Sequence, residues 1–530
     1  MTIYQIFTRL YGNPATQNLA NGTLAENGSA KLNGFTASVL KRIKDYGFSH
    51  VWFTGVIEHA TQTDYSHLGI ASDHPQVVKG KAGSPYAIKD YFDIDPDLAV
   101  RPEKRMAEFE ALVARTHKAG LKLIMDFVPN HVARQYHSDA APAGVTGLGE
   151  GDDTLKHFSP SNNFYYCWGE ALHVDYLPES QGIPYVESPA KATGNDKFDA
   201  CPGMNDWYET VKLNYGVDYH GHGAKHFLPI PNTWTKMVEI LLFWAAKGVD
   251  AFRCDMAEMV PVEFWEYAIK EVKSKFPAIE FIAEVYNPAQ YRSYIHTGGF
   301  DYLYDKVGLY DTLRAIVCRQ APASQITQAW QATDDVKQHM LYFLENHDEQ
   351  RIASDFFCGN ARLAFPALAV MALMGTNPLM IYAGQELGER GMDAEGFSGC
   401  DGRTTIFDYW SPETLRKLAA LPSPKSRTKK AGPELTECEA EIYQYYYQIL
   451  QLRQQHSAFS EGMFYDLMYV NYDGSHGFDA GCHYAFLRSS ENEVALVVAN
   501  FSDVEKQVGV KIPAHAFEWM NLPEGNFTAK

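Results

Sequence analysis

The stretch that decides the fold of this 530-residue chain is Gly248-Val249-Asp250-Ala251-Phe252-Arg253-Cys254-Asp255. Its β-branched and aromatic residues predict a buried strand. Side chains alternate along a strand, so Arg253 and Asp255 face the same side at its carboxyl end. A guanidinium beside a carboxylate favours the ionised acid, which is the form that a nucleophile needs. We therefore interpret Asp255 as a candidate nucleophile and Arg253 as its cation.

Three further apolar runs end in polar clusters of the same kind, which are Asp126…Asn130-His131, Glu284 and Asn346-His347-Asp348. A single acid at a strand end is more often a turn residue, a helix cap or half of an ion pair than a catalytic group. Arg253 and Asp255 by themselves also fit a structural salt bridge. The functional interpretation depends on four clusters in one chain, because parallel strands that bring their carboxyl ends to one edge build a single site there.

Eight strand-like runs recur along the chain: Ile3–Thr8, His50–Val56, Leu121–Val128, Gly248–Asp255, Glu280–Tyr286, Phe300–Asp305, Met340–Asp348 and Pro378–Glu386. Between them, apolar residues at helical spacing predict amphipathic helices, most clearly in three groups: Trp234, Met237, Val238, Leu241 and Ala245; Trp265, Ala268, Ile269, Val272 and Phe276; and Ile442, Tyr445, Tyr446, Ile449 and Leu452. The alternation predicts an α/β fold with a parallel sheet, and eight units favour a closed (β/α)8 TIM barrel. The alternative is a doubly wound open sheet, which more naturally carries a glycine-rich phosphate loop that the sequence lacks.

Two segments fall outside the alternating pattern. Residues 132–231 are rich in Gly, Ser, Asn, Tyr and His and lack long periodic helices, so we expect a long insertion after the third strand that walls the cleft. Beyond His456, three runs predict a C-terminal antiparallel β domain: Tyr484–Leu487, Val494–Asn500 and Val508–Ile512. The predicted domains are the catalytic barrel (1–131 and 232–457), the insertion (132–231) and a β-sandwich-like domain (458–530).

Composition narrows the range of partners. The net charge of −19 disfavours nucleic acid and anionic membranes, so a neutral or small substrate is expected. The 8 Cys include no C-x-x-C pair, which argues against a zinc ribbon or a dense disulfide framework. Residues 364–383, the longest nearly uncharged stretch, contain Pro366, Gly375 and Pro378, so we expect no membrane span. No signal peptide is evident, which predicts a cytoplasmic protein; if a signal was removed, a periplasmic or secreted location is the alternative.

The acids suggest a specific chemistry. Glycosidic bonds are broken by paired carboxylates, of which one is a nucleophile or base and the other a proton donor. Glu284 ends an apolar run and has no cation beside it in the sequence, which predicts a desolvated general acid to partner Asp255. Asp348 and His347 could hold sugar hydroxyls and stabilise developing positive charge, and His131 could donate to another hydroxyl.

Together these clusters resemble the four signature regions of the α-amylase family of retaining glycoside hydrolases and transglycosylases. The regions are Asp126-Phe127-Val128-Pro129-Asn130-His131, the stretch Gly248 to Asp255, Ile282-Ala283-Glu284-Val285, and Asn346-His347-Asp348. Their order matches the family, and so does their placement on strands three, four, five and seven. Residues 3–7, 83–88 and 381–386 are also similar, so the resemblance spans nearly the whole chain.

The resemblance implies a hydrolase that acts on starch-like α-glucans or malto-oligosaccharides through a covalent glycosyl-enzyme. Asp255 would be the nucleophile, Glu284 the acid and then the base, and Asp348 the stabiliser of the transition state. The same resemblance implies five substrate-binding or supporting residues: Tyr86, which would stack on the sugar, Asp126, His131, Arg253 and His347.

No cofactor is needed for this chemistry, but the resemblance raises a structural calcium ion as a hypothesis. Asn130 matches one calcium ligand of the family; the alternative is a turn residue. Many α-amylases carry Lys-His shortly after the nucleophile, where the His helps to hold calcium and the Lys reaches the acceptor-side sugar. Glu258-Met259 stand there in this chain. That departure motivates a second hypothesis, a glucosyl- or maltosyl-transferring transglycosylase. A third, a silent carbohydrate-binding scaffold, is less favoured because all three acids are present.

Overall fold

Eight parallel strands form the central sheet of the computed structural model, which describes residues 1–177, 183–391, 397, 399–426, 432–491 and 493–521. The strands are β1 (Thr2–Phe7), β2 (His50–Thr54), β5 (Lys122–Phe127), β12 (Ala251–Cys254), β13 (Glu280–Ala283), β14 (Tyr302–Tyr304), β15 (Met340–Leu341) and β16 (Leu379–Tyr382). Their order is β15-β14-β13-β12-β5-β2-β1-β16, and a parallel bridge from Tyr342 to Leu379 joins the two ends. The predicted (β/α)8 barrel is confirmed, and the open-sheet alternative is wrong.

The interior of the barrel is a packed core. Each of the eight strands contributes one side chain to it: Ile3, Trp52, Ile124, Ala251, Ile282, Tyr304, Leu341 and Met380. Such inward layers are how a closed barrel fills its centre. Several strands end earlier than the sequence predicted, most clearly Met340–Asp348, of which only the first two residues pair in β15. The polar cluster Asn346-His347-Asp348 therefore lies in the loop at the carboxyl end of the strand.

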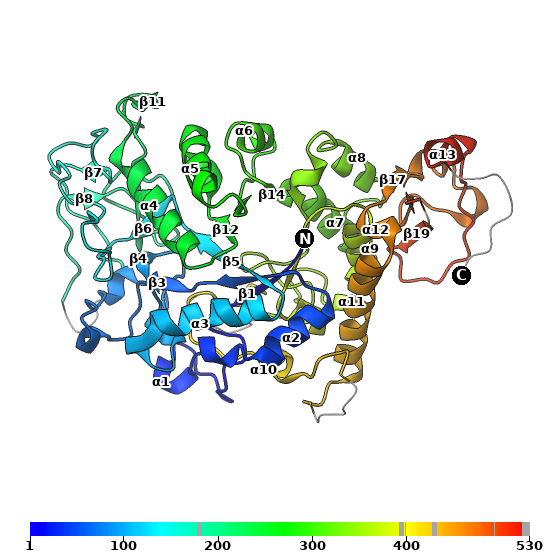
Figure 1. The fold of residues 1–530 in the computed structure, drawn as a ribbon, viewed down its shortest axis with the longest axis horizontal. Coiled ribbons are helices and arrows are strands. Elements are labelled where there is room, and N and C mark those ends of the chain that lie inside the picture. Colours follow the sequence, from blue (N-terminus) through cyan, green and yellow to red (C-terminus); the bar gives the residue numbers. More distant parts are fainter. Residues whose placement is uncertain (178–182, 392–396, 398, 427–431, 492, 522–530) are drawn as a thin grey trace.

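The helices lie on the outside of the barrel, except α13, which lies beside the C-terminal sheet (Figure 1). They are α1 (Leu24–Asn27), α2 (Ala37–Tyr46), α3 (Arg105–Lys118), α4 (Asn232–Ala246), α5 (Val262–Lys275), α6 (Tyr291–His296), α7 (Asp311–Val317), α8 (Gln325–Gln331), α9 (Phe365–Leu373), α10 (Glu413–Ala420), α11 (Glu437–Gln455), α12 (Ser457–Ser460) and α13 (Ala514–Trp519). The three groups of apolar residues at helical spacing fall in α4, α5 and α11, except Phe276, which follows the last residue of α5. In α11 the stripe is buried at Ile442, Tyr446 and Ile449, whereas Leu452 is 38% exposed.

The segment after β5 contains strands and loops but no helix among its described residues up to α4. Its strands are β6 (His131–Ala133), β7 (Tyr166–Cys167), β8 (Ala190–Lys191), β9 (Thr210–Lys212), β10 (Val217–Asp218) and β11 (Ala224–Lys225). β6 and β9 pair antiparallel, with His131 opposite Lys212. A hairpin of β3 (Ile57–His59) and β4 (Ile88–Ile94) precedes it. The insertion lies at one end of the molecule and the C-terminal sheet at the other (Figure 1).

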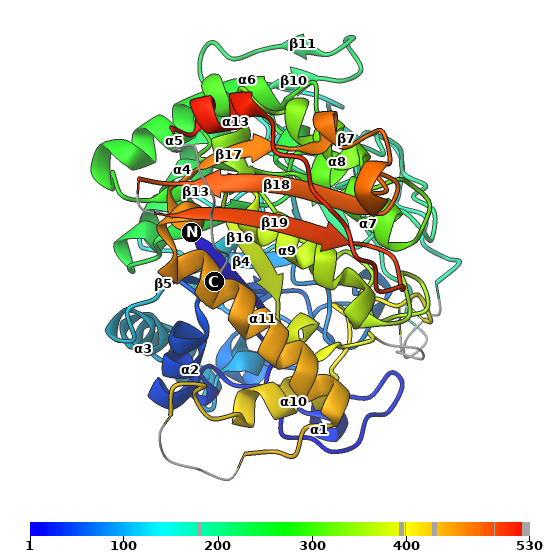
Figure 2. The ribbon, with the colours of Figure 1, turned by 90° about the vertical axis from the view of Figure 1, so that its right-hand side faces the viewer.

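The C-terminal sheet has three antiparallel strands in sequence order, β17 (Met463–Asp466), β18 (His483–Ser489) and β19 (Val494–Asn500) (Figure 2). The prediction of a strand at Val508–Ile512 is wrong. The Lys511 amide donates to the Asn471 side chain and Gly509 to the His476 carbonyl, so loop contacts replace a ladder. The described residues form one sheet that packs on α9 and α12, rather than two facing sheets. Residues 522–530 of the predicted domain lie outside the described part.

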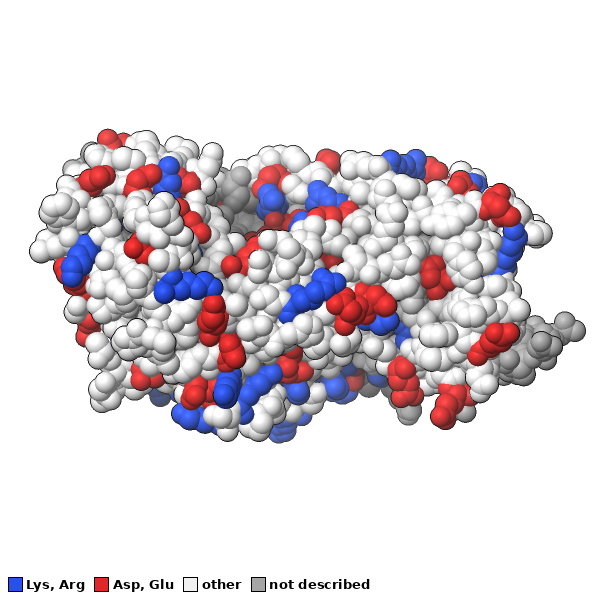
Figure 3. Space-filling model, turned by 90° about the horizontal axis from the view of Figure 1, so that it is seen from above, with Lys and Arg blue, Asp and Glu red and all other residues white. Residues whose placement is uncertain are grey.

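Two further features bear on the predicted partners. Among the described residues, no helix combines the length and the apolar character that crossing a membrane requires. Seen from above, Lys and Arg side chains are interspersed with Asp and Glu over the surface (Figure 3).

Candidate active site

The predicted acids meet at the carboxyl end of the barrel. Asp255 follows β12, Glu284 follows β13 and Asp348 follows β15. All three line one cleft of about 630 Å³, together with Tyr86 and His131. The parallel sheet explains this convergence, because the residues that follow strands running in the same direction all lie at the same rim of the barrel.

Arg253 lies beneath the cleft floor and joins the acids. Its side chain is fully buried; one terminal nitrogen lies 2.7 Å from Asp255 Oδ1 and the other lies 2.7 Å from Glu284 Oε2. Its Nε donates to the Tyr304 hydroxyl at 3.1 Å, and Asp126 Oδ1 is 3.5 Å away. Glu284 has no cation beside it in the sequence, but in space it has Arg253. The pairing of β12 with β13, with Arg253 opposite Ile282, supplies that cation.

Two more donors hold Glu284. The Met256 amide donates to Oε2 at 2.9 Å, and the Tyr286 hydroxyl donates to Oε1. Met256 has a φ of 43° and a ψ of 41°, in the left-handed region that residues other than glycine seldom adopt. This turn directs the amide that follows the candidate nucleophile towards the candidate acid. Such strain is commonly retained at functional sites.

His347 and Tyr86 stand beside Asp348. Gln5 Nε2 lies 2.8 Å from His347 Nδ1, which leaves His347 Nε2 facing the Tyr86 hydroxyl and Asp348 Oδ2, the latter at 3.1 Å. The rings of Tyr86 and His347 are stacked, with centroids 5.2 Å apart. Burial, reinforced by Arg253, lowers the pKa of His347 well below its usual value, so the ring is neutral.

The acids around Arg253 outnumber the positive charges near them, so burial opposes the ionisation of several carboxyl groups. Burial raises the pKa of Asp348 to about 7 and that of Asp126 to about 6. Burial and the charge of Glu284 also raise the pKa of Asp255, against the opposing effect of Arg253. We expected Arg253 to keep Asp255 ionised; it lowers the cost of ionisation, but burial acts more strongly. Interacting acids titrate as a group, so the raised pKa values of Asp255 and Asp348 describe protons shared between them.

The insertion supplies the opposite wall. The His131 ring lies 5.2 Å from the ring of Trp207, and burial together with Lys212 and Lys79 lowers the pKa of His131 to about 3. Lys79 Nζ is 3.1 Å from Glu209 Oε2, so this charged pair also lines the cleft. All eight predicted catalytic and substrate-binding residues thus lie in or directly beneath the cleft.

Sequence reasoning missed five side chains that shape the site: Gln5, Trp52, Trp207, Tyr286 and Tyr304. All but Trp207 lie on predicted strands. A polar or aromatic residue near the carboxyl end of such a strand could have indicated that its side chain reaches the site. Trp52 donates from Nε1 to Asp126 Oδ2 at 3.0 Å, so it fixes the acid that supports the floor.

Asn130 lies outside the cleft, at the joint between the barrel and the insertion. Its Nδ2 donates to the Gly194 carbonyl at 2.7 Å, and its Oδ1 accepts from the Lys212 ammonium. No group of three or more His, Cys, Asp and Glu side chains with metal-binding geometry occurs among the described residues.

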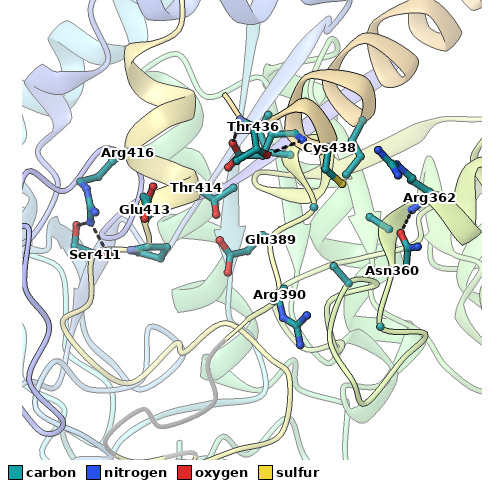
Figure 4. A pocket seen from close by; sticks show the side chains of 18 of the residues that line it. Asn360, Arg362, Glu389, Arg390, Ser411, Glu413, Thr414, Arg416, Thr436 and Cys438 are labelled. Atoms are coloured by element: carbon teal, nitrogen blue, oxygen red, sulfur yellow. Dashed lines mark hydrogen bonds between the residues drawn. The ribbon is translucent and has the colours of Figure 1, made fainter. Parts of the chain in front are cut away.

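A larger hollow of about 770 Å³ lies away from the acids, between α10, α11 and the loop after β16 (Figure 4). Its charged groups are engaged locally. Arg416 donates to the Ser411 carbonyl at 2.6 Å, and Arg390 pairs with Asp355 at 3.1 Å. Since none of the candidate catalytic acids lines it, the smaller cleft is the candidate active site.

The family assignment follows from the sequence as a whole. The family model for the α-amylase catalytic domain matches residues 5–462. The chain belongs to the α-amylase family. This membership places it among enzymes that act on glycosidic bonds, and the acids described above lie within the matched range.

The relatives of this α-amylase family member are distant. Cyclomaltodextrinase from Geobacillus thermopakistaniensis is 22% identical over 479 residues, and alpha-amylase 2 from Dictyoglomus thermophilum is 21% identical over 498 residues. These matches cover 89% and 91% of this chain, which spans only 66% of the length of each relative.

Solved structures carry the same fold. An alpha-amylase from Lactobacillus plantarum has a TM-score of 0.56 at 20% identity, with 97% of this chain and 91% of that chain covered. The noncanonic maltogenic alpha-amylase AmyB from Thermotoga neapolitana has a TM-score of 0.56 at 19% identity, with 94% and 86% covered. At these identities the likeness establishes the fold alone.

Proposed function

We propose that this protein is a retaining hydrolase of α-glucosidic bonds in starch-like α-glucans or malto-oligosaccharides. One observation carries the proposal: a single buried guanidinium lies 2.7 Å from Asp255 and 2.7 Å from Glu284, at the ends of neighbouring strands. Two carboxylates held by one Arg253 lie close together. Retaining enzymes hold their two carboxyl groups about 5 Å apart, whereas inverting enzymes leave room for a water between theirs, and a shared guanidinium favours the closer arrangement.

In the first step, Asp255 attacks the anomeric carbon while Glu284 gives its proton to the departing glycosidic oxygen. The carbon–oxygen bond to the leaving sugar breaks as the bond to the Asp255 carboxylate forms. In the second step, Glu284 takes a proton from water, the water oxygen attacks the anomeric carbon, and Asp255 leaves. Two inversions return the α-anomer. Arg253 holds Asp255 Oδ1, so the other carboxylate oxygen is available for the attack.

The proton and the charge of the transition state come from the acid cluster. Because burial raises the pKa of Asp348 and of Asp255, the acids of the cleft hold protons more readily than free carboxyl groups do, which suits a reaction that needs a proton donor. The transition state carries positive charge on the sugar ring. A carboxylate that lines the cleft is held in place to stabilise that charge more strongly than water would. We assign this role to Asp348, which lines the same cleft.

Neutral rings around the cleft suit an uncharged sugar. Burial lowers the pKa values of His131 and His347, so both rings are neutral, and His131, which lines the cleft, can bond sugar hydroxyl groups without adding a net charge. Tyr86 offers an aromatic face that a sugar ring can stack on. These features support malto-oligosaccharides over a charged substrate.

Transfer to a sugar acceptor is the second candidate. Glu258, which replaces the lysine common in the family, accepts from the Tyr286 and Asn287 amides at 3.2 and 3.0 Å. It thus fastens the loop behind Glu284 instead of presenting a cation to an acceptor. Tyr286 and Val307 line the cleft beside Glu284, and apolar neighbours favour a sugar acceptor over water.

Time-resolved proton NMR of the full chain with maltotetraose tests the proposal. Prompt α-anomeric reducing ends and shorter products are expected, and Asp255→Ala should lose about 10⁴-fold or more of the rate. Products longer than the substrate would favour transfer. Prompt β-anomers, or undiminished cleavage by Asp255→Ala, would contradict the mechanism. Asp250→Asn, on the same strand segment but outside the cleft, is the matched control.

A further inference from the structure

A buried lysine ties the insertion to the barrel beside the active site. The Lys212 side chain, at the end of β9, is only 2% exposed. Its ammonium lies 2.6 Å from Asp196 Oδ1 and 3.2 Å from the Met259 carbonyl oxygen, and it also donates to Asn130 Oδ1. An ammonium has three N–H donors, and this one meets three oxygen acceptors.

The three acceptors come from separate parts of the chain. Asn130 follows β5, Met259 belongs to the short helical turn Ala257–Met259 after β12, and Asp196 comes from the insertion. Lys212 also stands opposite His131 in the β6–β9 ladder, and Asn130 Nδ2 lies 3.1 Å from His131 Nδ1. One positive charge therefore holds together the insertion, the turn after the candidate nucleophile and a wall of the cleft.

These residues do not fit the calcium ion considered from the sequence. Calcium takes about six to eight oxygen ligands, and the residues bound to Lys212 supply one amide oxygen, one carboxylate and one carbonyl. An ammonium already lies between them, and a second cation there would be strongly repelled in a buried setting. Met259, which replaces the family's calcium-binding histidine, contributes only its main-chain oxygen.

We propose that the Lys212 ammonium takes the place of a structural calcium ion, so that this chain joins its insertion to the barrel without metal. The charge is neutralised locally by Asp196, whose side chain is 38% exposed and so remains partly hydrated. A buried ammonium is tolerated when it is paired and all its donors are bonded, as they are here. This inference does not depend on which glycosidic bond the enzyme cleaves.

Metal content and thermal unfolding of the purified full chain test the inference. Elemental analysis after dialysis should find no stoichiometric calcium, and neither EDTA nor added CaCl₂ should change the Tm. One bound calcium per chain, or a Tm that falls in EDTA, would overturn the proposal.

Variants distinguish a substitute cation from an ordinary structural lysine. Lys212→Ala leaves the three oxygens without their shared charge, so its Tm should fall by roughly 5 °C. Millimolar CaCl₂, but not NaCl of equal ionic strength, should restore part of that loss, because the vacated space can admit calcium together with the water molecules that complete its oxygen ligands. An unchanged Tm in Lys212→Ala, or a loss that calcium does not restore, contradicts the inference.

Lys225→Met is the matched control. Lys225 also links the insertion to the barrel, through Glu263 of α5 at 2.5 Å, but its side chain is 53% exposed. Exposed pairs of this kind contribute at most about 1 kcal/mol. Its Tm should therefore stay close to that of the wild type and should not respond to calcium.

Discussion

Replacing Arg253 by lysine tests the central feature of the site. The guanidinium reaches Asp255 and Glu284 with different nitrogens, each at 2.7 Å, while its Nε donates to Tyr304 at 3.1 Å. A lysine ammonium is a point charge on a flexible stem and cannot reproduce that fork. Arg253→Lys should keep the positive charge and lose direct contact with one of the two acids.

The size of the effect follows from those contacts. One hydrogen bond to a charged group is worth about 1.5–3 kcal/mol. Every 1.4 kcal/mol or so corresponds to a factor of ten in rate, so kcat/KM should fall by roughly 10- to 150-fold. The acid that loses its partner should ionise less readily. The acidic limb of the pH profile should therefore move to higher pH by about one unit, which is the energetic equivalent of about 1.4 kcal/mol.

The assay is kcat/KM for consumption of maltotetraose between pH 4 and pH 9. Arg351→Lys is the matched control, since Arg351 is equally buried and pairs with Glu345 at 2.8 Å outside the cleft. The control should lose stability but keep the position of the acidic limb. An unmoved limb in Arg253→Lys, with kcat/KM within about threefold of the wild type, would refute the bridging role.

Two further predictions concern the neighbours of the acid pair. Tyr286→Phe removes the hydroxyl that donates to Glu284 Oε1, so kcat should fall about tenfold with little change in Tm. A fall in kcat that comes with a marked fall in Tm would point to a packing role instead. Burial raises the pKa of Asp348 to about 7, so the stability that this group contributes is lost as pH rises through that value. Asp348→Asn should abolish activity. It should also raise the Tm at pH 8 by roughly 1–2 °C, a small gain because the side chain is 40% exposed and its charge is screened by solvent. No gain is expected near pH 4, where the carboxyl group is protonated. A gain that is equal at both pH values would contradict this account.

The barrel could be predicted because its signals are local. The run from Gly248 to Asp255 has the apolar character of a buried strand, and β12 occupies Ala251–Cys254. The sequence could predict that the acids lie together, because the carboxyl ends of parallel strands meet at one rim of a barrel and the acids follow those ends. The C-terminal strands are different: β17 was missed and Val508–Ile512 was wrongly assigned. Outside the repeating alternation of strand and helix, a short strand forms only where a partner backbone is available, and the sequence does not name that partner.

The sequence by itself determined the eight strands, the helix faces and which acids reach the rim, because periodicity and strand ends are encoded in neighbouring residues. Tertiary structure alone decided how those acids share charge. Arg253 meets Glu284 through the register of β12 and β13, and Lys212 meets Asn130 and Met259 through the fold of the insertion. Electrostatic interactions depend on distance and burial in space, and residues far apart in the chain acquire both only when the fold is complete.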